Sequence, residues 1–171
     1  MNLADAIGVL RALAVVPIAF AILAEQHALA LALFALAALS DAVDGWLARH
    51  AGAATRHGVL LDPLADKVLV VGTLIALSAA HTGWPVTVVT VLVAARELAV
   101  AGLRIGAFAR AIALPADRLA KLKTAAELVG TGMIVWTERP WAVLGAGLVG
   151  LAFLLGLYTL PRYMAAARRA S

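Results

Sequence analysis

The chain alternates long apolar runs with short polar segments, and this pattern predicts a bundle of membrane-spanning helices. A helix that crosses a bilayer needs about 20 mostly apolar residues, and six runs meet this length. Short polar separators, such as Glu25-Gln26-His27 and Glu138-Arg139-Pro140, divide the runs. We predict six transmembrane helices at about 6–24, 28–48, 60–80, 85–108, 118–137 and 141–160.

The composition favours an all-α integral membrane protein. Of the 171 residues, 64% are hydrophobic, and the mean hydropathy is +0.97. A water-soluble core cannot absorb this much apolar surface. Alanine and leucine dominate the sequence, and they favour helices over a β-barrel. The chain has no cysteine, which excludes disulfides and thiolate chemistry, and its length predicts a single domain over residues 1–171.

The basic residues predict how the spans are oriented. If both termini lie on one side, that side receives thirteen of the fourteen Lys and Arg residues, and the other side receives only Arg139. Membrane proteins carry an excess of basic residues on their cytoplasmic side. We therefore expect the spans to cross an inner or plasma membrane with both termini in the cytoplasm. The net charge of the chain is +4, and its basic residues lie between the apolar runs. This placement indicates binding to anionic headgroups or phosphorylated ligands rather than to nucleic acid.

Four aspartates lie near the cytoplasmic ends of neighbouring predicted spans. Asp41 and Asp44 are close to the end of the second span, and Asp62 and Asp66 are close to the start of the third. A helix turns about 100° per residue, so each pair shares a face. Two antiparallel helices would therefore bring four carboxylates together, and these repel one another unless cations neutralise them. Mg²⁺ or Mn²⁺ suits such oxygen ligands.

The residues beside these aspartates suit a phosphate group. Gly45 and Ala48 lack bulk and share the face of Asp41 and Asp44, so a ligand can approach the helix closely there. Arg49 follows on that face and can hold a phosphate through two parallel hydrogen bonds. Together with the aspartates, these residues predict a site for a metal-bound phosphate compound.

The whole motif resembles a known family signature. The string D-A-V-D-G-W-L-A-R at 41–49, followed at fixed spacing by Gly58, Asp62 and Asp66, is similar to the signature of the CDP-alcohol phosphatidyltransferase family. Every signature position and every spacing matches. The layout of six spans resembles that family as well, so the resemblance covers nearly the whole chain.

The resemblance implies a role for each residue of the motif. Asp41, Asp44 and Asp62 would be ligands of divalent metal, with two ions of Mg²⁺ or Mn²⁺ expected. Asp66 would take the proton from the acceptor hydroxyl and also touch the second ion. The donor would be CDP-diacylglycerol, and the protein would be a homodimer. The expected CDP-binding residues are Gly45, Ala48, Arg49, Thr55 and Gly58.

Two basic segments resemble the branch of the family that uses glycerol 3-phosphate as acceptor, the phosphatidylglycerophosphate synthases. These segments are Ala95-Arg96-Glu97, followed by Leu103-Arg104, and Lys121-Leu122-Lys123-Thr124. Their basic groups lie near the cytoplasmic ends of two spans, where they can hold an acceptor phosphate. Glu97 is expected to orient one arginine through an ion pair. The candidate acceptor-binding residues are Arg96, Arg104, Lys121 and Lys123. The alternative is that these residues only set the membrane topology and attract lipid headgroups.

Two further features concern single positions. The start of the chain resembles the same branch through Asn2, Arg11 and Pro17. Glu127 lies inside the fifth predicted span, where a charge is costly. It either lines the cavity or pairs with a basic residue that the sequence does not identify.

The resemblance implies transfer of a phosphatidyl group from CDP-diacylglycerol to glycerol 3-phosphate with release of CMP. One alternative is the same chemistry with phosphatidylglycerol, inositol phosphate or serine as acceptor. A second alternative is a cation transporter, since buried carboxylates also line ion paths. A transporter would need polar groups that extend to the far side, whereas the outer halves of the second and third spans are apolar.

Overall fold

The computed structural model describes the backbone of residues 3–51, 58–80, 83–109, 118–136 and 138–169, and over these residues it contains helices and no strands. Side chains are described within these ranges except at 3–5, 41–51, 58–63, 104, 107–109, 118, 120, 139 and 159–169. The expected all-α fold is confirmed for this part of the chain.

The described residues form seven helices, and each predicted span corresponds to one helix or to a pair of helices. The helices are α1 (Leu3–Leu13), α2 (Val15–Leu23), α3 (His27–Ala51), α4 (Gly58–Ala79), α5 (Trp84–Ala109), α6 (Arg118–Val135) and α7 (Arg139–Arg169). The first predicted span is divided into α1 and α2. The last helix continues well beyond the predicted end near residue 160.

The break between α1 and α2 lies at Ala14 and has a cause in the sequence. Pro17 has no N–H group, and its ring crowds the carbonyl of Leu13, which interrupts the helical hydrogen bonds there. The N–H of Ala14 is shared between the carbonyls of Leu10 at 2.9 Å and Arg11 at 3.2 Å. The regular hydrogen-bond pattern is therefore interrupted at Ala14, whose φ of −60° and ψ of −20° nevertheless stay helical.

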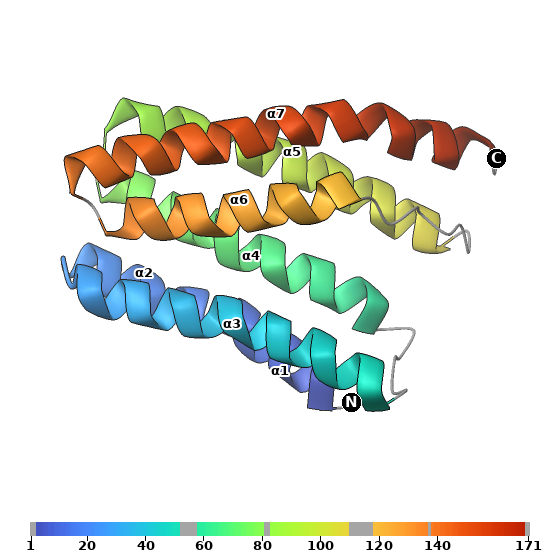
Figure 1. Ribbon diagram of the computed structural model, residues 1–171, viewed down its shortest axis with the longest axis horizontal. Helices are drawn as coiled ribbons and strands as arrows, with labels where there is room; N and C mark the ends of the chain where they lie inside the picture. Colours follow the sequence, from blue (N-terminus) through green and yellow to red (C-terminus); the bar gives the residue numbers. More distant parts are fainter. Residues whose placement is uncertain (1–2, 52–57, 81–82, 110–117, 137, 170–171) are drawn as a thin grey trace.

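The helices run back and forth along one bundle (Figure 1). The C-terminal ends of α2, α4 and α6 and the N-terminal ends of α3, α5 and α7 lie at one end of the bundle. The N-terminal ends of α1, α4 and α6 and the C-terminal ends of α3, α5 and α7 lie toward the other end. Helix α4 is central, since it contacts α1, α2, α3, α5 and α6. Residues near the start of α4 can therefore meet side chains from several neighbouring helices.

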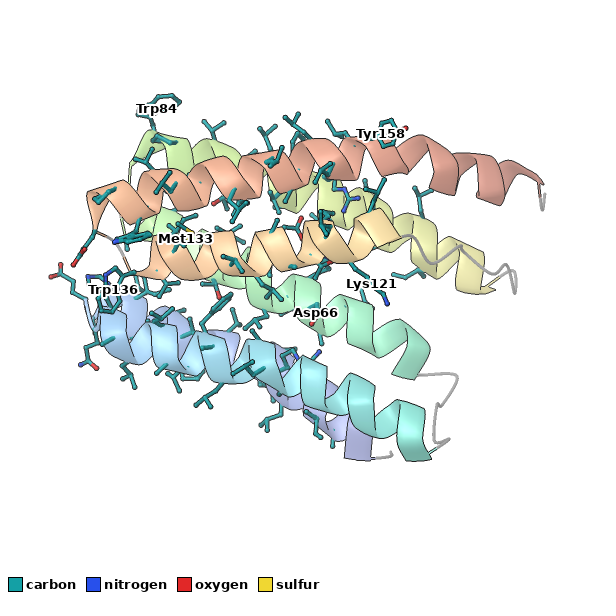
Figure 2. All side chains as sticks on the ribbon, viewed as in Figure 1. Asp66, Trp84, Lys121, Met133, Trp136 and Tyr158 are labelled. Carbon is teal, nitrogen blue, oxygen red and sulfur yellow. The ribbon has the colours of Figure 1, made fainter. Side chains whose placement is uncertain are left out.

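Three helical stretches are long and apolar enough to cross a membrane by length and composition, among the described residues. They are Ala6–Leu23, Trp84–Leu103 and Pro140–Tyr158, and His27–Ser40 is a shorter apolar stretch. Trp84 and Trp136 are exposed at the end of the bundle opposite the termini, while Asp66 and Lys121 lie toward the end that holds the termini (Figure 2). Two exposed tryptophans thus mark the end of the bundle opposite Asp66 and Lys121.

Small residues bring α6 and α7 into close contact. A β-carbon at Gly130 on α6 would lie 2.8 Å from the carbonyl oxygen of Gly145 on α7, so both helices need glycine at this crossing. Elsewhere the core is filled by buried aliphatic side chains from several helices. It includes Ile18, Ile22, Leu69, Leu74, Leu77, Ile134 and Val149.

Candidate functional site

The four predicted aspartates lie on two contacting helices at the same end of the bundle. Asp41 and Asp44 are in the C-terminal half of α3, and Asp62 and Asp66 are in the first turns of α4. The two helices contact each other and run in opposite directions (Figure 1). The backbone therefore has the arrangement that the motif predicts, although the side chains of Asp41, Asp44 and Asp62 lie outside the described residues.

Asp66 is the member of this set whose side chain is described, and it forms an ion pair with Arg11. Nη1 of Arg11 donates to Oδ1 of Asp66 at 3.0 Å. The Asp66 side chain is 17% exposed, whereas the Arg11 side chain is fully buried. Arg11 comes from α1, which contacts both α3 and α4. Arg11, one of the basic residues expected to orient the spans in the membrane, thus lies beside the predicted catalytic carboxylate.

Arg11 also contacts α3 close to the first predicted metal ligand. Its Nε lies 3.3 Å from Oγ of Ser40, the residue before Asp41. Ser40 Oγ in turn donates to the carbonyl of Ala37 at 2.8 Å. Arg11 therefore joins the two helices that carry the aspartates.

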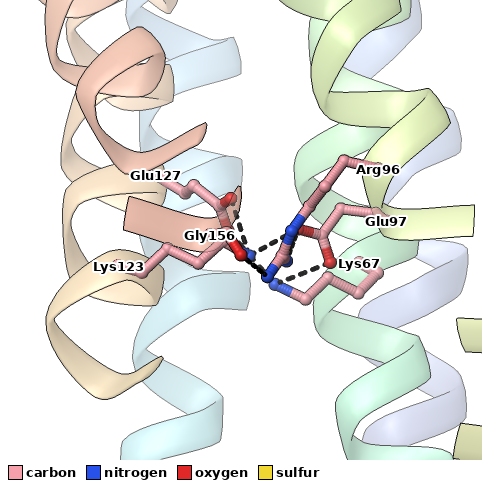
Figure 3. A network of polar contacts seen from close by, with 6 residues as sticks. All are labelled: Lys67, Arg96, Glu97, Lys123, Glu127 and Gly156. Atoms are coloured by element: carbon pink, nitrogen blue, oxygen red, sulfur yellow. Dashed lines mark hydrogen bonds and ion pairs between the residues drawn. The ribbon is translucent and has the colours of Figure 1, made fainter. Parts of the chain in front are cut away.

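A second cluster of charges lies inside the bundle, next to Asp66 along α4. Lys67 Nζ lies 3.1 Å from Glu127 Oε2 on α6 and 3.4 Å from Glu97 Oε2 on α5. Lys123 also pairs with Glu97, and its Nζ lies 2.9 Å from Glu127 Oε1 without the alignment of a hydrogen bond. Arg96 pairs with Glu97 as well. Figure 3 shows that Lys67 reaches between the two glutamates.

This cluster, which we name the buried ion network, consists of Lys67, Arg96, Glu97, Lys123 and Glu127. Glu97 and Glu127 are 4% and 1% exposed, so both acids of the network are withdrawn from solvent, while the Lys67 side chain is 20% exposed. Removing charges from water is costly unless each is paired. With three basic groups and two acidic groups, the network carries an excess of one positive charge.

Arg96 is held to a third element, α7. Its Nη2 donates to the carbonyl oxygen of Gly156 at 3.1 Å, as Figure 3 shows. Its Nε is buried and has no hydrogen-bond partner among the described atoms. The guanidinium is therefore fixed on one edge, and a further acceptor is needed to satisfy Nε.

The candidate acceptor-binding residues lie in different environments. Arg96 and Lys123 both pair with Glu97. The expected ion pair between Glu97 and an arginine is confirmed, and the arginine is Arg96. Lys121 is exposed. Arg104 lies in α5, but its side chain is outside the described residues.

The expected CDP-binding residues lie at the same end of the bundle as the aspartates, where they are described. Gly45, Ala48 and Arg49 are in the last turns of α3, and Gly58 begins α4. Thr55 lies outside the described residues, as do the side chains of Ala48 and Arg49.

The sequence did not identify two members of the buried ion network. The sequence indicates only a role in orienting the spans for Lys67, and it names no partner for Glu127. The structure pairs them over 60 positions in the sequence. A local signal did exist, because Lys123 and Glu127 are four residues apart on α6 and such pairs face each other.

The described side chains include no group of three or more His, Cys, Asp or Glu that would hold a metal ion. Three of the four predicted ligands fall outside this described set. Carboxylates nevertheless suit a hard divalent cation, and the backbone of all four aspartates lies at adjoining ends of two contacting helices.

Comparison with known proteins gives two kinds of match. A sequence model described as CDP-alcohol phosphatidyltransferase matches residues 1–158, which include α1 to α6 and α7 as far as Tyr158. The chain is also 32% identical over 139 residues to the CDP-diacylglycerol–glycerol-3-phosphate 3-phosphatidyltransferases of Escherichia coli K12, Shigella flexneri and Salmonella typhimurium. Each of these alignments covers 80% of this chain and 76% of the relative.

Proposed function

The chain belongs to the CDP-alcohol phosphatidyltransferase family, and on this basis we propose that it transfers the phosphatidyl group of CDP-diacylglycerol to glycerol 3-phosphate. The products would be CMP and phosphatidylglycerophosphate. Relatives named for this reaction are 32% identical over most of the chain. The observation that carries the proposal is that two helices in contact bring the Asp41–Asp44 pair and the Asp62–Asp66 pair to one end of the bundle.

In the proposed reaction, a hydroxyl of glycerol 3-phosphate attacks the phosphorus atom that bears diacylglycerol. The new phosphorus–oxygen bond forms as the bond to the CMP oxygen breaks, and Asp66 accepts the hydroxyl proton as general base. Asp66 suits this role because its side chain is partly exposed and its Oδ1 is held by Arg11. The base is thus ordered before the substrate arrives.

We propose that Asp41, Asp44, Asp62 and Asp66 hold two divalent ions, Mg²⁺ or Mn²⁺. Bound there, the ions supply charge neutralisation for the donor diphosphate and for the leaving CMP. The support is the ligand chemistry and the backbone placement of the four residues. The proposed CDP-binding residues, on the neighbouring turns and the intervening segment, are Gly45, Ala48, Arg49, Thr55 and Gly58.

The acceptor phosphate is proposed to bind near the basic groups of α5 and α6. The excess positive charge of the buried ion network and the unpartnered Nε of Arg96 both favour an anion nearby. An unphosphorylated alcohol could accept a hydrogen bond from Nε, but it would not offset the excess positive charge. The proposed acceptor-binding residues remain Arg96, Arg104, Lys121 and Lys123.

The proposed setting is an inner or plasma membrane that the chain crosses six times, with both termini and the active site in the cytoplasm. The common end for both termini and the exposed Trp84 and Trp136 at the opposite end support this orientation. A homodimer is part of the proposal through family membership. The lipid donor would then enter from the cytoplasmic leaflet.

Asp66→Asn tests the proposed chemistry, because the amide cannot accept the hydroxyl proton. We expect this variant to retain CDP-diacylglycerol binding in nanodiscs while CMP release in the presence of glycerol 3-phosphate and Mg²⁺ falls to background. Glu138→Gln, an exposed carboxylate at the other end of the bundle, is the control and should match the wild type. Normal turnover by Asp66→Asn would exclude Asp66 as the base.

A further inference from the structure

Arg11 is a buried cation in a helix that carries none of the residues proposed for the chemistry. Its residue exposure is 2%, and its side chain is fully buried. A guanidinium at such a position is expensive, and its loss of hydration must be offset by the contacts it makes. A basic residue that only oriented the chain in the membrane would reach water or headgroups instead.

The contacts of Arg11 are divided between the two helices of the acidic motif. Nη1 holds Oδ1 of Asp66 on α4 at 3.0 Å, while Nε reaches Ser40 on α3 at 3.3 Å. Ser40 directly precedes Asp41 and is itself fixed by the carbonyl of Ala37. One buried guanidinium thus bridges Asp66, the last aspartate of the motif, and Ser40, the residue before the first aspartate.

The other side of α4 is also held. Lys67 follows Asp66, so its side chain leaves the helix about 100° away from that of Asp66. It is bound by Glu97 and Glu127 from α5 and α6. Two adjacent residues of α4 are therefore tied to different sets of neighbours, which restricts rotation of α4 about its own axis.

We infer that Arg11 is a positioning residue that orients the Asp66 carboxylate and fixes α3 against α4, so that both halves of the acidic motif face one substrate. The inference rests on the proposed function of Asp66. Arginine is required because its planar fork donates from two nitrogens in different directions, whereas lysine offers a single compact ammonium. Charge alone at position 11 does not suffice.

The kinetic test compares Arg11→Lys, Arg11→Met and Leu10→Met in nanodiscs. Leu10 is 67% exposed beside Arg11, so its variant is the matched control and should behave as wild type. We expect Arg11→Lys to lose about tenfold and Arg11→Met about a hundredfold in kcat, with the KM for CDP-diacylglycerol nearly unchanged, because small misplacements of reacting groups are costly. A kcat of Arg11→Lys within about twofold of wild type would contradict the inference.

A structural readout separates this inference from the proposed reaction. The chain has no cysteine, so spin labels can be attached at Leu36→Cys on α3 and Ile75→Cys on α4, both exposed positions. Arg11→Met should shift or broaden the distance distribution between these labels. A label pair at Leu98→Cys on α5 and Leu154→Cys on α7, also exposed, should not change.

Together, the kinetic and spin-label measurements distinguish failure of the proposed function from failure of this inference. If the wild type used no CDP-diacylglycerol, the proposed function would fall, and the spin-label distances would still decide whether Arg11 fixes α3 against α4. If the wild type were active and the α3–α4 distance were unchanged in Arg11→Met, the inference would be overturned while the proposed function stood.

Discussion

The carbonyl oxygen of Gly156 accepts a hydrogen bond of 3.1 Å from Nη2 of Arg96, across the contact between α7 and α5. The guanidinium lies against the α-carbon of this glycine. A β-carbon at position 156 would lie 2.8 Å from both Cζ and Nε of Arg96. The position of Arg96 in the buried ion network therefore depends on a residue without a side chain, 60 positions away in the sequence.

Gly156→Ala should displace the Arg96 guanidinium. We expect the free energy of unfolding to fall by about 1–3 kcal/mol, as in overpacked sites, and the KM for glycerol 3-phosphate to rise. Gly147→Ala on the same helix is the control, because a β-carbon there meets nothing within 4 Å. Denaturant unfolding in detergent and acceptor kinetics measure both effects. Equal behaviour of the two variants would contradict the packing argument.

Glu97→Gln should destabilise the bundle. Glu97 pairs with Lys67, Arg96 and Lys123. Its neutralisation leaves three cations, two of them buried, with Glu127 as the remaining acid of the network. Breaking a buried ion pair costs about 3–5 kcal/mol, so we expect a clear drop in Tm. Glu138→Gln, at an exposed position, should leave Tm unchanged. A stable Glu97→Gln variant would show that the network contributes little.

Lys123 and Lys121 form a matched pair on α6, since the first is buried in the network and the second is exposed. We expect Lys123→Met to raise the KM for glycerol 3-phosphate about tenfold with a smaller change in kcat, because it removes binding made before the transition state. Lys121→Met should have a weaker effect. Acceptor titrations at saturating CDP-diacylglycerol measure this difference, and the opposite ranking would place the acceptor phosphate outside the network.

Asp62→Asn should lower turnover about a hundredfold or more, since one ligand charge is lost from the proposed metal site. The Mg²⁺ concentration for half-maximal activity should rise, and EDTA should abolish activity of the wild type. Glu25→Gln, an exposed acid at the far end of the bundle, serves as the control. Robust turnover in EDTA would refute the metal-assisted mechanism.

The helices were largely predictable because apolar runs and their polar separators are local signals. The predicted span 60–80 agrees well with α4, Gly58–Ala79, for example. The break at Ala14 was not predicted, although Pro17 was visible in the sequence. The continuation of α7 to Arg169 was also missed, because span prediction measures the length needed to cross lipid and a helix can continue beyond it.

The candidate site was predictable only as far as its motif. The spacing of Asp41, Asp44, Asp62 and Asp66 is local and is fixed by two short helical stretches. The pairing of Arg11 with Asp66 and of Lys67 with Glu127 joins residues 55 and 60 positions apart. Such pairs depend on which helices pack together, and a single sequence contains no local signal for that.

The most direct test of the proposed function is product identification with an acceptor panel. Purified protein in nanodiscs is given CDP-diacylglycerol and Mg²⁺ with glycerol 3-phosphate, serine, inositol phosphate or phosphatidylglycerol, and lipid products are identified by mass spectrometry alongside CMP release. We predict phosphatidylglycerophosphate and CMP in equal amounts, with glycerol 3-phosphate as the preferred acceptor. A preference for serine or phosphatidylglycerol, or no CMP release with any acceptor, would contradict the account.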